Sequence, residues 1–517
     1  MKIQNSLHSF AGSNRIGSCV PSLFMAFALP FWSSAQALPP LLPWPCAVAA
    51  PDGQAGPFDT VVHGFSHRYN PPDICAAYGV DALHNEGWTG QGQTIVVVDP
   101  YGSPTVLQDL QVFSSTYGLP APNLTIIYPD GQPTLNSTAK LSAAFETCLD
   151  LQWAHAIAPD ANLVLIASNP DETQGVQGFP SMFKGIQYAI SNYPGSPISQ
   201  SFAVTEQSFS GSTNLQAADL VQVARFDAIY QQAIAAGCTP LAASGDWGTA
   251  NPVKQAYQNG TGAKSSDAYP FPTVSWPASS PWVTAVGGTW LQYHWRWDPG
   301  TNYAAFLALT GADSGPYNTN NPLLIAFMNY DTTADRVETV WREDWTLVLE
   351  TGHGQNNGVT GGGLSAIYPT PSWQSGLPTS LTQGARALPD VSWNAASDGS
   401  AHVYCSQANG WNGASGTSVA TPQIAGVVAL VNQMRASMGK GPIGHLAPKL
   451  YQLPASDFND IVPQTFGSGA NAITLQDNFR FGYTVPGLPV TVGYDLTTGL
   501  GSPKAYSFAH DLATMFP

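Results

Sequence analysis

Short apolar runs alternate with longer stretches of helical periodicity along most of the chain from Tyr69 onward. The run Thr94 to Val98 is rich in β-branched residues and ends in Asp99-Pro100-Tyr101-Gly102, so it predicts a buried strand followed by a turn. Similar runs predict further strands at Asn162 to Ala167, at Thr239 to Ala243 and at Trp282 to Val286, the last closed by Gly287-Gly288. Helical patterns cover Leu141 to Ile157 and Phe226 to Ala236.

This alternation of strands and helices predicts an α/β protein. Strands that are apolar throughout, without polar alternation, are typical of a parallel sheet that is covered on both faces. We therefore expect a largely parallel central sheet with helices on both faces, within a chain of 517 residues that can form one large domain or two.

The N-terminal region departs from this pattern. Lys2 and Arg15 supply positive charge, Val20 to Trp32 is apolar, and Ala35-Gln36-Ala37 is a small-x-small cleavage site, which together predict a secretory signal peptide. A membrane anchor is the alternative, but the apolar run is short for a bilayer. We expect a secreted protein, extracellular or periplasmic, with three parts: a signal peptide over 1–37, a Pro/Ala/Gly-rich lead-in over 38–66 and one domain over 67–517, in which Asn302 to Asn357 is a surface excursion.

The composition narrows the possible partners. Only 10% of the residues are charged, and the formal net charge is −16 with 17 lysines and arginines, so nucleic acid is excluded as a partner. No segment after the signal has the apolar length of a membrane span, and we expect a monomer. Because so few basic groups gain charge in acid, the composition favours acid tolerance.

The cysteines leave the disulfide pattern open. Cleavage after Ala37 leaves an odd number of cysteines in an oxidising compartment, so one or two disulfides are compatible with the sequence, but the pairing cannot be read from it. The sequence contains neither a CxxC nor an HExxH motif, which gives a zinc site little support. The cysteines concerned are Cys46, Cys75, Cys148, Cys238 and Cys405.

The stretch Ser415 to Pro422 reads SGTSVATP and precedes a long helix-compatible apolar run. It places Ser418 on the first turn of that helix, with Gly416 allowing a tight bend just before it. A hydroxyl at a helix N-terminus lies where negative charge developing on an oxygen is stabilised. The alternative is that Ser418 only caps the helix.

Two carboxylates lie four residues apart in the sequence FETCLDLQWAHAI. A helix places Glu146 and Asp150 on one face, and the apolar residues around them predict that this face is poorly solvated. Carboxylates forced together away from water titrate as a pair with one raised pKa, which makes a usable proton acceptor and donor. A solvated helix face is the alternative.

A further carboxylate follows a predicted strand in LAASGDWG. The end of a parallel strand points into the crevice where such sheets place their functional sites, which makes Asp246 a candidate site residue. The alternative is a turn former, since Gly-Asp-x-Gly turns are common.

Six motifs in this order resemble the sedolisin family of serine-carboxyl peptidases, relatives of the subtilisin-like fold. The motifs are ETCLD, AASGDWG, WPASSPWVTAVGGT, GGGLSAIYPTPSWQ, RALPDVSWNA and SGTSVATP, and the match extends from about Tyr69 to Pro517. The resemblance implies that Ser418 is the nucleophile, Glu146 its base, Asp150 the partner of that base and Asp246 the oxyanion donor. It also implies a subtilisin-like fold and a serine-type endopeptidase that acts on proteins or peptides.

The chemistry of these residues predicts activity in acid. Serine is a weak nucleophile until a base takes its proton, and a carboxylate with a modestly raised pKa can do so at low pH. Asp246 can donate a hydrogen bond to an oxyanion only when its carboxyl group is protonated. This also requires low pH or a raised pKa.

The last part of the chain resembles the family's calcium site. Phe458-Asn459-Asp460-Ile461 and Gly493-Tyr494-Asp495 supply the carboxylates and backbone carbonyls that Ca²⁺ prefers. Two turn aspartates are the alternative. The resemblance implies one structural Ca²⁺ in a C-terminal calcium-binding region, with side-chain ligands from Asp460 and Asp495 and carbonyl ligands from Ile461, Thr491 and Gly493, where Thr491 replaces the family's usual glycine.

Three departures from the family pattern are expected to matter. The long N-terminal prodomain is not expected, because only about thirty residues separate Ala37 from the start of the match. Asp99 occupies a position where the family often has glutamate, and Phe202 one where it often has tryptophan. The shorter acid and the missing indole N–H are expected to reduce the number of hydrogen bonds that support Asp150. Ala203 replaces a common glycine on the substrate-pairing segment that begins at Ser201, where we expect a substrate contact.

Two other functions remain open at this stage. A true subtilisin-like peptidase also uses a GTS serine, and Asp99 stands where its strand-end aspartate lies, but it needs a histidine in an HGTH-like turn, which the sequence lacks. His155 is expected to pack or to face solvent. The other alternative is a catalytically inactive secreted binding protein on the same scaffold, against which the complete set of four catalytic residues argues.

Overall fold

The computed structural model describes residues 68–134, 138–169, 179–209, 215–253, 268–293, 336–342, 358–397, 399–466, 473–480 and 482–517. Its longer helices are α1 (Pro71–Tyr78), α3 (Val106–Thr116), α4 (Thr138–Ile157), α5 (Phe179–Asn192), α6 (Ala217–Ala235), α12 (Thr417–Ser437) and α14 (Ala505–Met515). Short helices are α2 (Val80–Asn85), α11 (Thr379–Thr382) and α13 (Ala447–Leu450), with 3-10 turns η2 (Glu206–Ser208), η4 (Ser372–Gln374), η5 (Ser406–Ala408) and η6 (Ala455–Asp457).

The central sheet joins eight strands of the described residues. They are β2 (Thr94–Pro100), β3 (Asn123–Ile127), β4 (Asn162–Ser168), β5 (Pro197–Gln200), β7 (Thr239–Ala243), β9 (Thr284–Tyr293), β10 (Arg336–Val340) and β13 (Val391–Asn394). Their order is β10-β9-β7-β5-β2-β4-β3, with β13 also paired to β9. Neighbouring strands are parallel except at β10, which runs antiparallel to β9, so the predicted largely parallel sheet is confirmed.

Smaller sheets lie around this core. They pair β1 (Arg68–Tyr69), β14 (Ser400–Cys405) and β15 (Gly410–Ala414); β11 (Gly363–Pro369) and β12 (Ala385–Leu388); β16 (Phe458–Asn459) and β19 (Ser502–Pro503); β17 (Gln464–Phe466) and β18 (Ile473–Leu475); and β6 (Val204–Thr205) and β8 (Ser275–Trp276).

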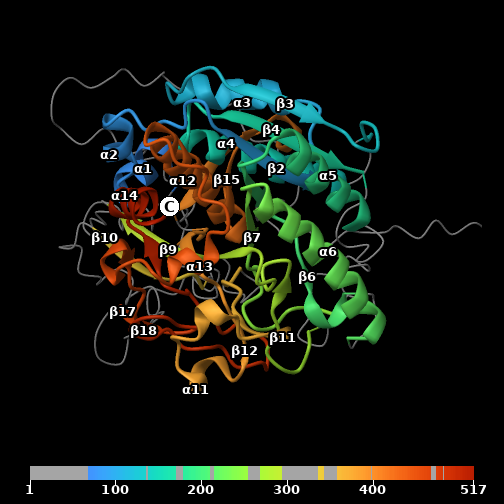
Figure 1. The fold of residues 1–517 in the computed structure, drawn as a ribbon, viewed down its shortest axis with the longest axis vertical. Coiled ribbons are helices and arrows are strands. Elements are labelled where there is room, and N and C mark those ends of the chain that lie inside the picture. Colours follow the sequence, from blue (N-terminus) through green and yellow to red (C-terminus); the bar gives the residue numbers. More distant parts are fainter. Residues whose placement is uncertain are drawn as a thin grey trace, which may run out of the picture.

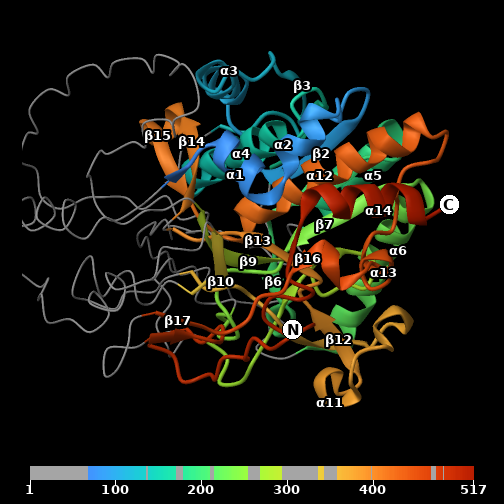
Figure 2. The same ribbon diagram turned by 90° about the vertical axis from the view of Figure 1, so that its left-hand side faces the viewer.

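The two faces of the sheet are buried under different helices. On β2, Ile95 and Val97 pack with residues of α3, α4, α12 and α14, whereas Val96 and Val98 pack with residues of α5 and α6. This follows from the two-residue period of a strand, which sends successive side chains to opposite faces. Figure 1 shows α5 and α6, in green, on the opposite side from α12 and α14, in orange and red. Figure 2 shows α12 and α14 lying side by side.

Most predicted elements agree with the structure. Strands β2, β4 and β7 and helix α4 lie where the sequence places them, within three residues at each end. Helix α6 begins at Ala217, well before the predicted start at Phe226. Its first turns hold Leu220 and Val221, which are largely exposed, so this part of the helix lacks a continuous apolar face.

The strand predicted from Trp282 to Val286 starts within two residues of its predicted start, but the prediction of its end is wrong. Strand β9 begins at Thr284 and runs through Gly287 and Gly288 to Tyr293. A Cβ atom at Gly287 would lie 2.5 Å from the Ser392 hydroxyl oxygen, and one at Gly288 would lie 2.7 Å from the Trp341 ring. The glycines therefore permit close packing within the strand instead of ending it.

The expected surface excursion from Asn302 to Asn357 is also corrected, as far as the structure describes it. Within this range residues 336–342 are described, and Arg336–Val340 forms β10 in the central sheet. Glu338 on this strand is buried and accepts hydrogen bonds from Tyr78 and Thr289. The sequence prediction missed it because a five-residue strand with charged positions has a weak periodic signal.

The signal peptide and the lead-in lie outside the described residues, so both remain predictions. In the described part of the chain, no helix combines the length and the apolar character that crossing a membrane requires.

Candidate active site

Ser418 lies on the first turn of α12, as the sequence predicts. Gly416 caps the helix with a φ of 124°, a backbone conformation that favours glycine, and Thr417 is the first helical residue. The Ser418 side chain is fully buried, and its hydroxyl oxygen has no hydrogen-bond partner among the described residues. An orphaned buried hydroxyl is costly unless a ligand or reactant satisfies it, so this position is a candidate for chemistry.

Helix α4 places its two carboxylates on the face that packs against α12. Glu146, Asp150 and Ala154 follow one another at four-residue spacing, so they share one face of the helix. A Cβ atom at Gly426 of α12 would lie 2.6 Å from the Cβ of Ile157 and 3.3 Å from the Ala154 carbonyl oxygen. Gly426 is thus the point at which the two helices approach most closely.

The two helices run in the same direction. Helix α4 connects the parallel neighbours β3 and β4, so it returns antiparallel to the strands. Helix α12 also runs against the strands. At its start the Thr417 amide donates to Asp246, just beyond the end of β7, and further along the Asn432 amide group donates to the Gly195 carbonyl, just before β5.

Because the two helices run in the same direction, the positions of Ser418 on α12 and Glu146 on α4 can be compared along the helix pair. Ser418 precedes Gly426 by eight residues, and Glu146 precedes Ala154 by eight residues. Eight residues of α-helix span about 12 Å, and the two paths run back from one contact point. Glu146 and Ser418 therefore both lie on the N-terminal side of the Gly426 contact, towards the same end of the helix pair.

Asp99 and Asp150 form a cluster of buried carboxyl groups with Glu146. Asp99 at the end of β2 and Asp150 on α4 are both fully buried, and neither carboxylate has a hydrogen-bond partner within normal distance among the described residues. Burial raises the pKa of Asp99 to about 7, with the Thr147 hydroxyl opposing part of the rise. Burial raises the pKa of Asp150 well above its usual value, and the negative charges of Asp99 and Glu146 raise it further.

Ser201 lies beside this cluster. It follows β5, its side chain is almost fully buried, and its hydroxyl partly opposes the rise in the pKa of Asp150. Phe202 and Ala203, which follow it, are buried as well. The Ser201 side chain thus faces the buried carboxylates, and a contact of this segment with substrate remains a prediction.

Asp246 lies at the N-terminus of α12. Its Oδ1 accepts hydrogen bonds from the Thr417 amide and from the Thr417 hydroxyl, each at 2.8 Å, whereas its Oδ2 has no partner among the described residues. Burial raises the pKa of Asp246 to about 7, and the bonds from Thr417 and the charge of Arg480 oppose the rise. One carboxyl oxygen is thus anchored and the other is available to donate when protonated.

Arg480 is a residue of this site that the sequence interpretation missed. It is buried, and its guanidinium stacks 3.6 Å from the centroid of the Trp247 ring and 4.8 Å from that of Tyr483. Trp247 follows Asp246 directly in the AASGDWG motif. Aromatic rings often bind cations, so this tryptophan was the sequence signal that could have pointed to an arginine here. The partner comes from a distant part of the chain, which no local pattern reveals.

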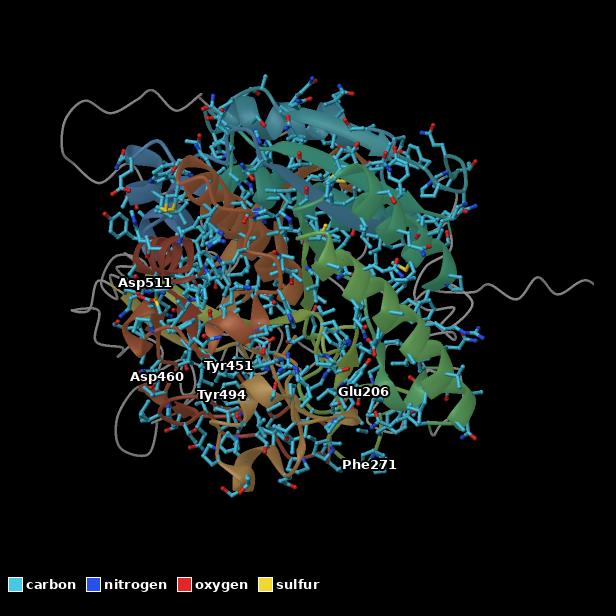
Figure 3. The ribbon with its side chains drawn as sticks, in the orientation of Figure 1. Glu206, Phe271, Tyr451, Asp460, Tyr494 and Asp511 are labelled. Atoms are coloured by element: carbon cyan, nitrogen blue, oxygen red, sulfur yellow. The ribbon has the colours of Figure 1, made fainter. Side chains whose placement is uncertain are left out.

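The sequence interpretation also missed Glu206. This residue is buried on η2 and accepts hydrogen bonds of 2.6 Å from the Ser365 hydroxyl and the Ala366 amide, so it joins η2 to β11 (Figure 3). Burial raises the pKa of Glu206 to about 7, with several hydrogen bonds opposing the rise. Its role in the described residues is to hold the segment that follows the triple glycine.

The candidate calcium ligands lie together. The Gly493 amide donates to Asp460 Oδ2 at 3.0 Å, and the Thr491 amide donates to Asp495 Oδ2 at 3.1 Å, so both carboxylates border one loop (Figure 3, where Asp460 is labelled). The amides of Thr497 and Thr498 and the Thr498 hydroxyl also donate to Asp495, so the loop anchors this carboxylate by donors. Carboxylate oxygens are the ligand type that Ca²⁺ prefers, and a calcium ion here remains a prediction. Because a backbone carbonyl is independent of the side chain, Thr491 can serve where the family has glycine. Ile461 follows Asp460 directly and is positioned by the same turn.

Comparison with known proteins assigns this fold and site to a family. The subtilase family model matches residues 138–448, which is more than half of the chain. Kumamolisin from Bacillus sp. (strain MN-32) is 30% identical over 443 residues, covering 84% of this chain and 62% of the relative. Sedolisin from Pseudomonas sp. (strain 101) is 27% identical over 453 residues, covering 87% and 62%, and tripeptidyl-peptidase 1 from Rattus norvegicus is 28% identical over 297 residues, covering 55% and 39%.

A solved structure gives the same assignment. Pseudomonas sedolisin, a serine-carboxyl proteinase solved in complex with two molecules of pseudo-iodotyrostatin, superposes with a TM-score of 0.60 at 25% identity. The match covers 87% of this chain and 100% of that one. The chain therefore belongs to the subtilase family and, within it, to the sedolisin family, and its α/β fold is subtilisin-like. It spans about 62% of the length of the curated kumamolisin and sedolisin that it matches.

Proposed function

We propose that this chain is a secreted, acid-active serine-carboxyl endopeptidase that hydrolyses peptide bonds in proteins or peptides. The observation that carries the proposal is that α4 and α12 run in the same direction and pack together at Gly426, with Glu146 and Ser418 towards the same end of the pair. Asp246 supports it from the other side, because it is anchored on the residue next to Ser418.

Ser418 and Glu146 carry out the proton and acyl transfers. The Ser418 oxygen attacks the peptide carbonyl carbon while Glu146 takes the hydroxyl proton, and the same proton then goes to the departing amine. Water repeats the sequence on the acyl-enzyme and releases the acid. Asp150 follows Glu146 by one helical turn and, with Asp99 behind it, holds Glu146 in place and shares its proton.

Asp246 stabilises the tetrahedral intermediate. Its Oδ2, the oxygen without a partner, donates a hydrogen bond to the oxyanion while its Oδ1 stays on Thr417. The raised pKa of about 7 keeps this carboxyl protonated in acid, where the reaction takes place. Burial is the main cause of this rise, and the Thr417 hydrogen bonds and the charge of Arg480 oppose it.

The substrate extends along the segment that begins at Ser201. This segment joins β5 to β6, beside the carboxylate cluster, and a peptide strand that pairs with it would lie next to Ser418. The enzyme acts as a monomer outside the cytoplasm, extracellular or periplasmic. This location is supported by the signal-like pattern of residues 1–37 and by the low content of charged residues.

Calcium stabilises the C-terminal region and takes no part in the chemistry. Enzymes of the sedolisin family bind calcium, and Asp460 and Asp495 border one loop here. Asp460, Ile461, Thr491, Gly493 and Asp495 would hold one ion. The ion binds the folded state only, so excess EDTA lowers the melting temperature, and Asp460→Asn abolishes that response. An identical melting curve with and without EDTA, together with no calcium by elemental analysis, contradicts this site.

Hydrolysis of casein between pH 3 and pH 7 tests the catalytic proposal. Wild-type protein cleaves casein with its highest rate in acid, and Ser418→Ala has no measurable activity, because the nucleophile is lost with almost no change in volume. Ser415→Ala, at the serine three residues earlier, is the matched control and keeps most of the activity. A wild-type protein that is folded at each pH but inactive supports the binding-protein alternative instead.

A further inference from the structure

A second cluster of chemically reactive side chains lies on the far side of α4. Cys148 belongs to α4, Cys405 is the last residue of β14 and Asp109 belongs to α3. The two sulfur atoms and one carboxylate oxygen all lie within 4.8 Å of one another, and all three residues are buried. Both cysteines are thiols in this structure. The catalytic proposal uses none of the three.

The two thiols have unequal environments. Cys148 donates to Asp109 Oδ2 at 3.5 Å, and its contact with Cys405, together with burial, raises its pKa well above the usual value. Cys405 has the opposite shift. The contact with Cys148 and the amides of Gln407 and Ala408 in η5 lower the pKa of its thiol, while burial opposes this. The two thiols thus differ in acidity, although the Cys405 thiol also donates to the Ala144 carbonyl oxygen at 4.0 Å.

The surroundings of Asp109 argue against a metal at this point. Its carboxylate already accepts hydrogen bonds from the hydroxyls of Thr105 and Ser406, besides the Cys148 thiol. Two thiolates and a carboxylate around a divalent cation would leave a buried net negative charge that no described basic group of the cluster offsets. A disulfide is neutral and leaves the two hydroxyl bonds of Asp109 in place.

We propose that Cys148 and Cys405 form a disulfide bond that ties α4 to the end of β14. The thiolate of one of the two cysteines attacks one sulfur of an external disulfide, either a small-molecule disulfide or that of a thiol oxidase. The sulfur of the other cysteine then displaces the second half of the oxidant from the mixed disulfide. In total, two S–H bonds break, one S–S bond forms, and the oxidant takes two electrons and two protons to become two thiols.

Burial sets the time at which this bond forms. Both sulfurs are inaccessible in the folded protein, so the oxidant reaches them while the chain is still folding, and the finished bond is protected from reductants. The other described cysteines, Cys75 and Cys238, lie outside this cluster and remain thiols.

The bond has a consequence for the catalytic helix, and this consequence rests on the proposed function. Cys148 follows Glu146 by two residues and precedes Asp150 by two, so it points to the opposite side of α4 from both carboxylates. The disulfide holds the back of the helix whose front carries the proton-transfer pair. It therefore limits the movement of Glu146 relative to Ser418.

Peptide mapping of wild-type protein tests the bond without any measurement of activity. Protein purified from the periplasm of an expression host is denatured with iodoacetamide and no reductant, and is then digested with trypsin. The four described cysteines fall on separate tryptic peptides, which span 69–140, 141–184, 226–254 and 387–435. We expect 141–184 joined to 387–435, with Cys75 and Cys238 alkylated. Alkylation of all four cysteines, or any other pairing of Cys148 or Cys405, overturns the proposal.

Thermal unfolding separates the cross-link from a bound metal. We expect Cys148→Ser/Cys405→Ser to lower the melting temperature by about 5 °C or more. Reductant during the melt should lower the wild-type value similarly and leave the double variant unchanged. The matched control, Cys75→Ser/Cys238→Ser, removes two other buried thiols and keeps the response to reductant. One zinc per wild-type chain that is absent from the double variant identifies a metal site and contradicts the disulfide. A cross-link in a catalytically inactive protein would refute the proposed function and leave the disulfide intact.

Discussion

Two regions of this protein bury acidic side chains equally deeply, but only one of them supplies these side chains with hydrogen-bond donors and a cation. Beside α4, Asp99 and Asp150 have no hydrogen-bond partner within normal distance and no nearby cation among the described residues. Between β12 and β13, Asp390 is just as buried but forms an ion pair of 2.6 Å with Arg386. Figure 3 labels Tyr451 and Tyr494 in this second region.

Asp390 is fully satisfied by its neighbours. Its Oδ2 also accepts from the Ala285 amide at 2.8 Å, and its Oδ1 accepts from the Tyr451 hydroxyl at 2.8 Å. The guanidinium of Arg386 stacks on the Trp373 ring. A buried carboxylate with a cation and two donors is held in place and fixes the loop that carries it.

The comparison shows that burial alone does not decide what a carboxyl group does. Where a cation and donors compensate the charge, the carboxylate serves as an anchor. Where burial is uncompensated and acids face one another, the carboxyl group retains a proton at mildly acidic pH and can exchange it. The first arrangement stabilises the fold, and the second suits catalysis.

The largest effect is expected from Glu146→Gln on the catalytic side. An amide cannot accept the serine proton, so casein hydrolysis should fall by roughly 10²–10⁴-fold. The melting temperature should not fall, because the change removes a charge next to Asp150. Initial rates and circular dichroism melts, both at the optimum pH, measure the two effects. Activity close to wild type would exclude Glu146 as the base.

Asp390→Asn should have the converse effect. It leaves the Arg386 guanidinium buried without its counter-charge, which should reduce the free energy of unfolding by about 3–5 kcal/mol. Hydrolysis per folded molecule should stay near the wild-type value. Urea unfolding and active-site titration give the two quantities. A loss of activity that exceeds the loss of folded protein would place Asp390 in the catalytic network.

Variants of Asp246 test whether its uncompensated carboxyl group donates a hydrogen bond during the reaction. Removing an oxyanion donor typically costs about 10²–10³-fold in rate, so Asp246→Ala should show a loss of that order at acidic pH. Wild-type activity should decline as pH rises through about 7, the pKa to which burial raises this carboxyl group. Asp246→Asn supplies a donor that does not titrate, so it should lose less activity on the alkaline side. If Asp246→Ala follows the wild-type profile, another group donates to the oxyanion.

A smaller effect is expected in the pH dependence of stability. Burial raises the pKa of Asp99 and of Asp246 from 3.8 to about 7, so protonation favours the folded state. Their contribution to stability is complete below pH 4 and is lost as pH rises through 7. In a Ser418→Ala background, which prevents autolysis, the melting temperature should fall by several degrees between pH 4 and pH 8, and Asp99→Asn should reduce this fall. A melting temperature that rises over this range would contradict the uncompensated burial of these acids.

Local sequence determined most elements and indicated the candidate site residues. The β-branched run at Thr94 and the apolar run at Thr239 have lengths and flanking turns that only strands satisfy, and both are confirmed as β2 and β7. The four-residue spacing of Glu146 and Asp150 fixed their common helix face, and Gly416 before Thr417 fixed the start of α12. These properties depend on residues within a few positions of one another.

Tertiary packing decided which of these residues meet. Glu146 and Ser418 lie towards the same end of the helix pair because Gly426 of α12 packs against Ile157 and Ala154 of α4. These contacts join segments that are far apart in the sequence. Strand β9 continues through its glycines because β13 and Trp341 pack closely on them, and β10 is a strand because β9 pairs with it. The pKa shifts of Asp99 and Asp246 likewise arise from the exclusion of water by the whole domain. Sequence therefore specified the reactive groups, and packing specified their separations and their charge states, because both depend on contacts between distant segments.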